Sequence, residues 1–526
     1  MSTKRPGGPA VQAAKLDQWL AYLYKPFQPL VRGRSLRRVE SRQWRAEDIL
    51  LPDGFVAEVV TTGLNAPVHC TFAPDGSCYV IECGHKIETR PRVLRVDPAT
   101  GATEVVYEFS DAEWRKTGAV TGACWHDGAL IVTDTDRLLR ITPDGKAQTL
   151  LDGLPGLGDH QTNYPVLGPD GRIYWGQGTA TNTAVVGADN FAYEWLPAFP
   201  DFHDVPGADV VLTGRNVRYR DVLGSLTHEV SCGAYVPFGT ATEPGQIIRG
   251  SAAASGAVLR CRPDGSELEC VAWGLRNPYG IAFHPDGRLF ATEHGIDERG
   301  ERYIVGDLED FYEIREGAWY GWPDYASGIR LDDPYWGDKG RNREPLLADP
   351  PDPDPPKPFV SLPPHAAPNG VDFCRDPAFG YEGDAFIALF GDVAPVTARP
   401  MTPVGFKVVR VDMRSGEVAD FAVNKINGPA SKLPHSGFER PSHCQFGPDG
   451  ALYVVDWGQI DIAPEVGGIR MPLASGALWR IRRTSGPVGP PPRARQVPLY
   501  LLQALVAAAG LAALVALVVY LLRRGG

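Results

Sequence analysis

Residues 281–293 read IAFHPDGRLFATE, two apolar runs on either side of a Pro-Asp-Gly turn. Apolar runs around such a turn indicate a β-hairpin. Two short β runs around a turn recur in CTFAPDGSCYVIE (70–82), CWHDGALIVTD (124–134), VLGPDGRIYWGQG (166–178), VDFCRDPAFGYEGDAFIALF (371–390) and CQFGPDGALYVVD (444–456). Six copies of one hairpin along a single chain indicate a repeat architecture.

Further strand-like pieces follow most of the hairpins, such as RVLRVDPATG and then TEVVYEF after the first copy. The unit is therefore a four-stranded antiparallel sheet, and six such units predict an all-β, six-bladed β-propeller. The last repeat stops at ALWRIRR and lacks a fourth strand, whereas GFVAEVVTTGL (54–64) precedes the first repeat without a partner. We expect this spare strand to complete the last blade, because closing the ring removes an open sheet edge.

The charge and the cysteine pattern of the chain argue against some classes of function. The net charge of the 526 residues is −11, although residues 1–50 and 485–526 are basic, so the body between them is strongly acidic. An acidic body disfavours nucleic acid as a partner. The nine cysteines form no CxxC motif, and those in strand-like runs are expected to be small buried residues; they are Cys70, Cys78, Cys124, Cys374 and Cys444.

The two ends of the chain point to a membrane. Residues 498–522 contain Gln503 as the one clearly polar side chain, and as a helix they would rise about 36 Å, enough to cross a hydrocarbon core of about 30 Å. We expect a single-pass transmembrane helix here, after a propeller over 51–484 and a Pro/Gly-rich linker over 485–497. Residues 1–50 form a basic arm, partly an amphipathic helix that lies on a membrane or against the body.

Polar residues stand where the chain enters the innermost strand of each blade, and these entries face the central channel of a propeller. They are His69, His160, Asn163, Arg276, Asn277, Asn369, Arg440 and His443. Arginine, histidine and asparagine on one concave face fit an anionic, hydrogen-bonding ligand, and a histidine there can act as a general base. The alternative is that these residues only line a water-filled channel.

Residues 51–484 resemble the glucose/sorbosone dehydrogenase family. The likeness is carried by GLRNPYGIAFHPDGRLFATEHG (274–295), GLPGLGDHQTNYPVLGPDGRIYWGQG (153–178) and ERPSHCQFGPDGALYVVD (439–456), with YGWP (320–323) after the acidic pair Glu309-Asp310. The resemblance implies a quinoprotein that uses pyrroloquinoline quinone (PQQ) and Ca²⁺ to oxidise a sugar or aldehyde.

The resemblance also implies roles for individual residues. His160 takes a proton from the substrate hydroxyl while hydride passes to PQQ. The other positions implied by the resemblance are Arg276, Asn277 and Arg440 around the quinone, and the backbone carbonyls of Gly295 and Ile296 on Ca²⁺. Two positions depart from the family pattern: Thr179 stands near the place of an aspartate that supports the catalytic histidine, and Ser442 replaces a second arginine.

The expected partners are a sugar or aldehyde substrate, a membrane quinone or cytochrome as electron acceptor, and a lipid bilayer. The side of the membrane stays open, because the family works outside the cytoplasmic membrane whereas the chain shows no signal-peptide pattern and carries arginines before residue 498. Two other functions are also compatible with the sequence: a non-catalytic propeller that binds a protein or glycan, and a Ca²⁺-dependent lactonase-like hydrolase.

Overall fold

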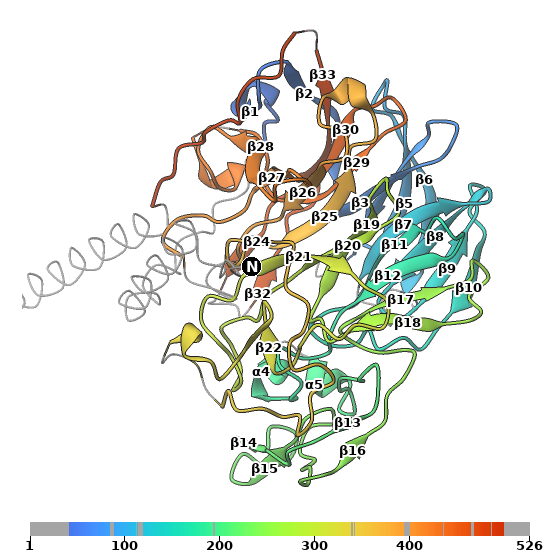
Figure 1. The fold of residues 1–526 in the computed structure, drawn as a ribbon. Coiled ribbons are helices and arrows are strands. Elements are labelled where there is room, and N and C mark those ends of the chain that lie inside the picture. Colours follow the sequence, from blue (N-terminus) through green and yellow to red (C-terminus); the bar gives the residue numbers. More distant parts are fainter. Residues whose placement is uncertain are drawn as a thin grey trace, which may run out of the picture.

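The computed structural model describes residues 42–498, apart from 85–88, 112, 114–118, 193–194, 338–339, 341, 394–399, 435, 464–467 and 485. Its main sheets are six antiparallel blades arranged around a central axis (Figure 1). The predicted six-bladed β-propeller of four-stranded blades is therefore confirmed.

Each blade runs from an innermost strand at the axis to an outer strand at the rim. The first blade consists of β3 (Pro67–Phe72), β4 (Cys78–Glu82), β5 (Arg92–Val96) and β6 (Thr103–Glu108). The second consists of β7 (Val120–His126), β8 (Ala129–Asp134), β9 (Leu138–Ile141) and β10 (Ala147–Leu151). The third consists of β11 (Thr162–Leu167), β12 (Ile173–Gln177), β17 (Ala257–Cys261) and β18 (Glu269–Trp273). The fourth blade consists of β19 (Pro278–Phe283), β20 (Leu289–Glu293), β21 (Glu309–Ile314) and β24 (Val360–Leu362). The fifth consists of β25 (Pro368–Phe373), β26 (Ala385–Leu389), β27 (Lys407–Val411) and β28 (Val418–Asn424).

The sixth blade joins the two ends of the propeller. It consists of β29 (Pro441–Phe446), β30 (Leu452–Asp456), β33 (Gly476–Arg483) and, as the outer strand, β2 (Phe55–Leu64). Strand β2 pairs antiparallel with β33 from Phe55 opposite Arg483 to Leu64 opposite Gly476. The spare strand expected from the sequence therefore completes the last blade, as predicted.

Tight turns and apolar layers hold the blades. In the hairpin between β19 and β20, Gly287 has a φ of 93°, a left-handed conformation that glycine adopts without steric cost. Successive blades pack through apolar clusters, which include the fully buried Trp175 and Trp479. The five strand cysteines named above are all buried, as expected for small apolar residues.

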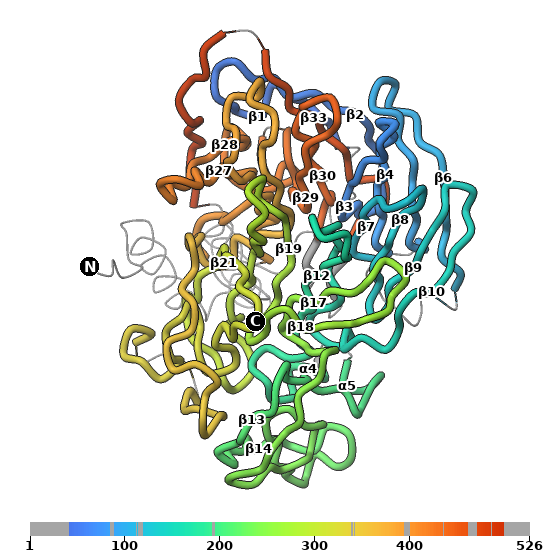
Figure 2. Tube along the Cα trace, turned by 45° about the vertical axis from the view of Figure 1, so that its right-hand side comes forward, coloured from blue at the N-terminus to red at the C-terminus, as the bar shows by residue number. Residues whose placement is uncertain are grey.

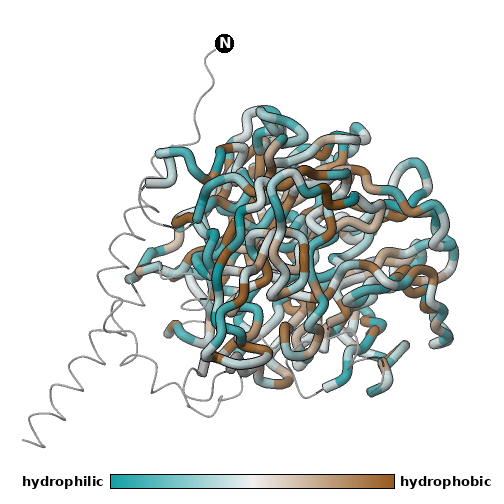
Figure 3. Tube along the Cα trace, turned by 90° about the horizontal axis from the view of Figure 1, so that it is seen from below, coloured by the Kyte–Doolittle hydropathy of each residue, from teal (hydrophilic) through white to brown (hydrophobic). Residues whose placement is uncertain are grey.

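The tube coloured by hydropathy shows the same pattern, with hydrophobic stretches running through the body and hydrophilic turns at its surface (Figure 3).

A long insertion leaves the third blade between β12 and β17. It contains α4 (Ala188–Ala192), α5 (Trp195–Ala198), β13 (Val210–Val211), β14 (Val217–Arg220), β15 (Glu229–Cys232) and β16 (Ile247–Ile248). These elements project from one side of the propeller, at the bottom of Figures 1 and 2. The remaining short elements are β22 (Tyr325–Ala326), β23 (Ile329–Arg330), β31 (Asp461–Ala463), β32 (Gly468–Arg470) and the 3₁₀ turns Ala46–Asp48, Pro334–Trp336, Pro377–Phe379 and Ala430–Lys432.

Both ends of the described chain lie against the body. Strand β1 (Ile49–Leu50) pairs with β28 and adds a fifth strand to the fifth blade. The linker after β33 is also attached: the amide of Gly489 donates to the carbonyl of Asp53, and Arg495 pairs with the segment around Ile426. The predicted spacer is therefore docked along the propeller as far as residue 495.

The predicted transmembrane helix at 498–522 falls almost entirely outside the described residues, as do residues 1–41 of the basic arm. Among the helices that the structure describes, none is long and apolar enough to cross a membrane.

Candidate active site

A cavity of about 370 Å³ opens where the chain enters the inner strands. Its wall includes His160 and Asn163 from the third blade, Arg276 and Asn277 from the fourth, and Asn369 from the fifth. The sequence therefore predicted five of the residues that the propeller brings together at this end of the channel.

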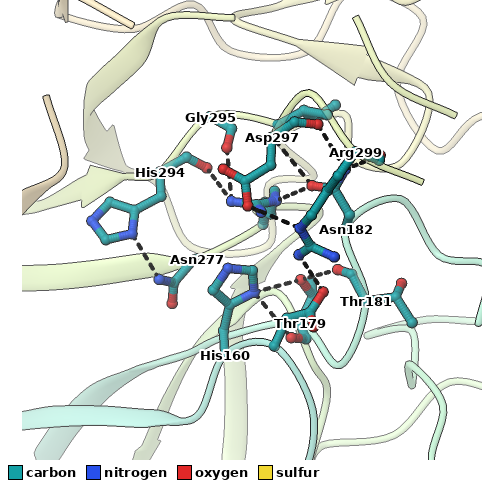
Figure 4. Close-up of polar contacts among 12 residues, drawn as sticks. His160, Thr179, Thr181, Asn182, Asn277, His294, Gly295, Asp297 and Arg299 are labelled. Carbon is teal, nitrogen blue, oxygen red and sulfur yellow. Dashed lines mark hydrogen bonds and ion pairs between the residues drawn. The ribbon is translucent and has the colours of Figure 1, made fainter. Parts of the chain in front are cut away.

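His160 is held in one tautomer. Its Nδ1 atom lies 3.1 Å from the carbonyl oxygen of Thr179 and 3.2 Å from the hydroxyl oxygen of the same residue (Figure 4). The carbonyl can only accept, and the hydroxyl already donates to the carbonyl of Thr181 at 2.7 Å. Nδ1 must therefore carry the proton, which leaves a lone pair on Nε2.

His160 is also held neutral. Burial, and then the positive charges of Arg276 and Arg299, keep its pKa well below the usual value. A neutral imidazole with a free Nε2 lone pair on a cavity wall can accept a proton from a bound hydroxyl group.

A buried carboxyl group supports the loop that positions His160. Asp204, from the insertion, accepts hydrogen bonds from the amide of Ala180 and the hydroxyls of Thr181 and Ser255. Burial raises the pKa of Asp204 to about 6. The carboxylate that the family places beside the histidine is absent at Thr179, and the nearby Asp204 contacts the loop instead.

The guanidinium of Arg276 is already hydrogen-bonded to neighbouring groups of the protein. Its guanidinium donates to the carbonyl of Gly295 at 2.7 Å, to the side-chain oxygen of Asn182 at 3.0 Å and to Asp297 at 2.9 Å. Burial alone would raise the pKa of Asp297, but Arg276 and Arg299 outweigh it and lower that pKa. Arg276 thus lies at the cavity, as predicted, within an ion pair that the sequence did not predict.

Arg299 is a second arginine on the cavity wall. It forms ion pairs with Asp159, Asp189 and Asp297. The sequence analysis did not single out Arg299, because it lies in the loop between β20 and β21 and not at the entry to an inner strand. Asp159, next to His160 in the chain, has a side chain that is 4% exposed, and burial raises its pKa despite Arg299.

Glu293 and His294 organise the entry to β19. One carboxylate oxygen of Glu293 accepts the backbone amides of both Arg276 and Asn277. The Asn277 side chain then donates to Nδ1 of His294 at 2.9 Å. These contacts explain why the Arg-Asn pair and the Glu-His pair occur at adjoining ends of one hairpin.

Several buried polar atoms on the cavity wall make no hydrogen bond within the described part of the protein. Among the described residues, Nε2 of His294, Nε2 of His365 and the side-chain oxygen of Asn369 make no hydrogen bond. Burial and the positive charge of Arg276 lower the pKa of His294 to about 4, and the nearby Asn369 side chain acts against this shift. Buried polar groups are normally paired, so this part of the wall fits a ligand that carries both donors and acceptors.

His365 is a further residue that the sequence analysis did not predict. Although burial opposes it, the Glu298 carboxylate 3.8 Å away raises the pKa of His365. The backbone of His365 has a φ of 65°, so it lies in a sharply turned segment just before β25. No pattern in the sequence marks this turn.

Three of the predicted entry residues lie outside the cavity lining. Arg440 donates to the carbonyls of Gly391 and Asp392 and lies between the rings of Phe390 and Phe406, at 5.0 and 4.9 Å. It therefore supports the wall from behind.

His69 and His443 also lie away from the cavity lining. Their rings pack against each other, with centroids 3.9 Å apart, and both contact Tyr164. The two histidines are part of the packing around the channel axis.

One of the two predicted calcium ligands, the carbonyl oxygen of Gly295, already has a hydrogen-bond partner. The carbonyl oxygen of Gly295 accepts from Arg276, and the amide of Ile296 donates to Asp307. Within the described ranges, no group of three or more His, Cys, Asp or Glu side chains is arranged to hold a metal ion. Ca²⁺ on the Gly295 carbonyl would lie beside the positive charge of the Arg276 guanidinium, which donates to the same oxygen.

The fold and the cavity define a six-bladed propeller with a polar site at one end of its channel. Comparison of the chain with known proteins shows which family it resembles. The model of the glucose/sorbosone dehydrogenase family matches residues 242–458, so the resemblance predicted from the sequence is confirmed. Quinoprotein glucose dehydrogenase B from Acinetobacter calcoaceticus is 24% identical over 316 residues, which cover 54% of this chain and 55% of that protein. The chain thus spans about half the length of that curated relative.

Two solved structures share the fold. The PQQ domain of pyranose dehydrogenase from Coprinopsis cinerea has a TM-score of 0.51 at 16% identity, covering 85% of this chain and 98% of that one. A Trichoderma reesei carbohydrate-active enzyme of family AA12 has a TM-score of 0.51 at 14% identity, covering 85% and 100%. At these identities the likeness concerns the fold.

Proposed function

We propose that the protein is a quinoprotein oxidoreductase that oxidises a sugar, or another aldehyde of the aldose type, by hydride transfer to PQQ. The observation that carries the proposal is the neutral His160, fixed with its proton on Nδ1, on a cavity wall that also exposes unpaired polar atoms. The relatives named above support the same class, since one is called a quinoprotein dehydrogenase and another a PQQ domain.

The residues have distinct tasks in this proposal. His160 accepts the proton of the substrate hydroxyl at Nε2, and the resulting charge is shared with Thr179 through Nδ1–H. Asn277, His294 and Asn369 orient the bound molecules through hydrogen bonds. PQQ, when bound, supplies the acceptor for the hydride that leaves the substrate carbon.

The wall fits PQQ in polarity and size, since cavities of about 300–1,000 Å³ commonly hold small ligands. Its arginines are already paired, however: Arg276 with Asp297, and Arg299 with three aspartates. Anionic groups of a ligand therefore compete with these carboxylates, and Ca²⁺ on the carbonyls of Gly295 and Ile296 competes with Arg276. We include Ca²⁺ in the proposal because the family resemblance implies it, and because a divalent cation would supply positive charge to the anionic groups of PQQ.

Membrane attachment is part of the proposal as well. The apolar residues 498–522 would anchor the body to a lipid bilayer, and a membrane quinone or a cytochrome would then take the electrons from the reduced cofactor.

The test is spectroscopic. Purified protein would be mixed with PQQ and Ca²⁺, and the quinone absorbance recorded while aldoses and aldehydes are added. Reduction of bound quinone in the wild type but not in His160→Gln would support the dehydrogenase. Absence of PQQ binding, with or without Ca²⁺, would overturn it.

The same experiment addresses a second candidate, a propeller that binds a glycan or protein without catalysis. The ion pairs of Arg276 and Arg299 with aspartates favour this function, because the aspartates neutralise the positive charges that an anionic quinone would otherwise bind. Absence of quinone binding in that experiment, together with tight sugar binding measured by calorimetry on the same protein, would support it.

A further inference from the structure

The C-terminal linker leaves the propeller close to the cavity. The amide of Arg495 donates to the carbonyl of Lys425, and the amide of Asn427 donates to the carbonyl of Arg495, each at 3.0 Å. Together they form a short parallel bridge beside the end of β28. In Figure 1 this last coloured stretch descends past β1 and β28.

Two further hydrogen bonds connect this bridge to the cavity wall. The Asn427 side chain donates to the carbonyl of Pro403 at 2.9 Å, and the next residue, Val404, donates its amide to Asp392 at 2.9 Å. Asp392 lines the cavity. The linker therefore ends on the same end of the propeller as the cavity, a few hydrogen bonds from its wall.

The tether between this bridge and the apolar stretch is short. Residues 496 and 497 lie between Arg495 and Pro498, where the apolar stretch begins. At about 3.5 Å per residue, the chain spans about 10 Å over these three steps. The inner strand β29 has six residues and is about 20 Å long at about 3.3 Å per residue. The opposite end of the propeller is thus beyond the reach of the tether.

Surface side chains at the cavity end agree with this geometry. Arg493 and Arg495 are exposed just before the apolar stretch, where they can contact anionic headgroups. Five of the nine exposed large apolar side chains in the described residues lie in loops that leave the blades at this end; they are Phe191, Leu223, Leu226, Ile247 and Leu473. Three of the nine lie at the opposite end, near the ends of their strands; they are Val56, Leu167 and Val418.

We propose that the end of the propeller that carries the cavity faces the lipid bilayer. This inference rests on the proposed membrane attachment and adds its orientation. A molecule then reaches the site from the membrane surface, which suits a lipid-soluble electron acceptor.

The test compares two labelled positions on full-length protein in nanodiscs of phosphatidylcholine and phosphatidylglycerol. Pro434→Cys lies next to the 3₁₀ turn at the cavity end, and Pro285→Cys lies in the β19–β20 hairpin at the opposite end. Both prolines are exposed, and Cys270, the one free cysteine described that is not fully buried, is replaced by serine in both proteins. A fluorophore on each cysteine is quenched by lipids with nitroxide headgroups.

We expect the label at position 434 to be quenched several-fold more strongly than the label at 285. Insertion of twelve Gly/Ser residues between Val497 and Pro498 should reduce the difference, because a long flexible tether frees the body to rotate. Equal or reversed quenching in protein that does enter nanodiscs would overturn the orientation alone. Failure to enter nanodiscs would overturn membrane attachment, and this inference with it, while leaving the PQQ test unaffected.

Discussion

The Nδ1 atom of His160 lies 3.2 Å from the hydroxyl oxygen of Thr179, which in turn donates to the carbonyl of Thr181. The family resemblance predicts a carboxylate in this neighbourhood. The carbonyl of Thr179, together with a hydroxyl that donates elsewhere, fixes the tautomer of the imidazole as a carboxylate would, but neither group adds a negative charge to stabilise the imidazolium. The proposed base should therefore be correctly oriented yet weak.

Replacement of His160 tests the base directly. We expect His160→Gln to lower kcat by about 10²- to 10⁴-fold, the usual contribution of general-base catalysis. Stopped-flow reduction of bound PQQ measures the chemical step. His228→Gln, at an exposed position in the insertion, is the matched control and should retain full activity. Unchanged kcat in His160→Gln would remove His160 from the mechanism.

A series at Thr179 tests the positioning of the base. Thr179→Val removes the hydroxyl contacts to His160 and to the carbonyl of Thr181. The contact to His160 is worth about 1 kcal/mol, so kcat/KM should fall about fivefold, whereas Thr179→Ser should retain activity. Thr179→Asp places a negative charge beside the imidazole, so the acidic limb of the pH profile should move upward. An identical pH profile for Thr179→Asp and the wild type would show that Thr179 does not act through His160.

Trp195 tests the role of the insertion. Its side chain lines the cavity from α5, and it is the one cavity residue contributed by the helices of the insertion that are described. Trp195→Ala should raise KM several-fold for a sugar substrate with little change in kcat, because ring contacts bind substrate without taking part in proton transfer. Trp195→Phe serves as the control. A fall in kcat with constant KM would contradict this role.

The raised pKa of Asp204 implies that the protein becomes less stable as the pH rises through the mildly acidic range. Burial raises its pKa from the usual 3.8 to about 6, so the folded protein retains a proton that the unfolded chain releases. The free energy of unfolding should therefore decrease as the pH rises from about 4 to about 6, by on the order of 3 kcal/mol from this group. Urea unfolding of Asp204→Asn between pH 4 and 7 should show a flatter dependence. Parallel curves for the two proteins would show that Asp204 is ionised in the folded state.

The fold was largely predictable because it depends on a repeated local pattern. Each hairpin is specified by a few neighbouring residues, and the missing strand of the last repeat matched the spare strand at 54–64. The strand β24 within the proline-rich segment was not predicted, since Val360–Leu362 is too short to show alternation.

The site was predicted only in part, because sequence position gives the place of a residue but not the direction of its side chain. Arg276 and Arg440 both precede inner strands, yet Arg276 faces the cavity while Arg440 turns back between two phenylalanine rings. Arg299 and His365 come from long loops whose paths depend on tertiary contacts, and the ion pairs of Arg299 join three separate segments.

The pairing of β2 with β33 has a consequence for how the protein is made. Strand β2 cannot find its partner until residues 476–483 have been synthesised, so the ring closes only after all six inner strands have been made. Until then β2 and β30 both present open edges, which are prone to pair with other chains. Truncation before Gly476 should therefore yield aggregates rather than a five-bladed remnant, and during biogenesis the nascent chain needs protection of these edges until its last blade is complete.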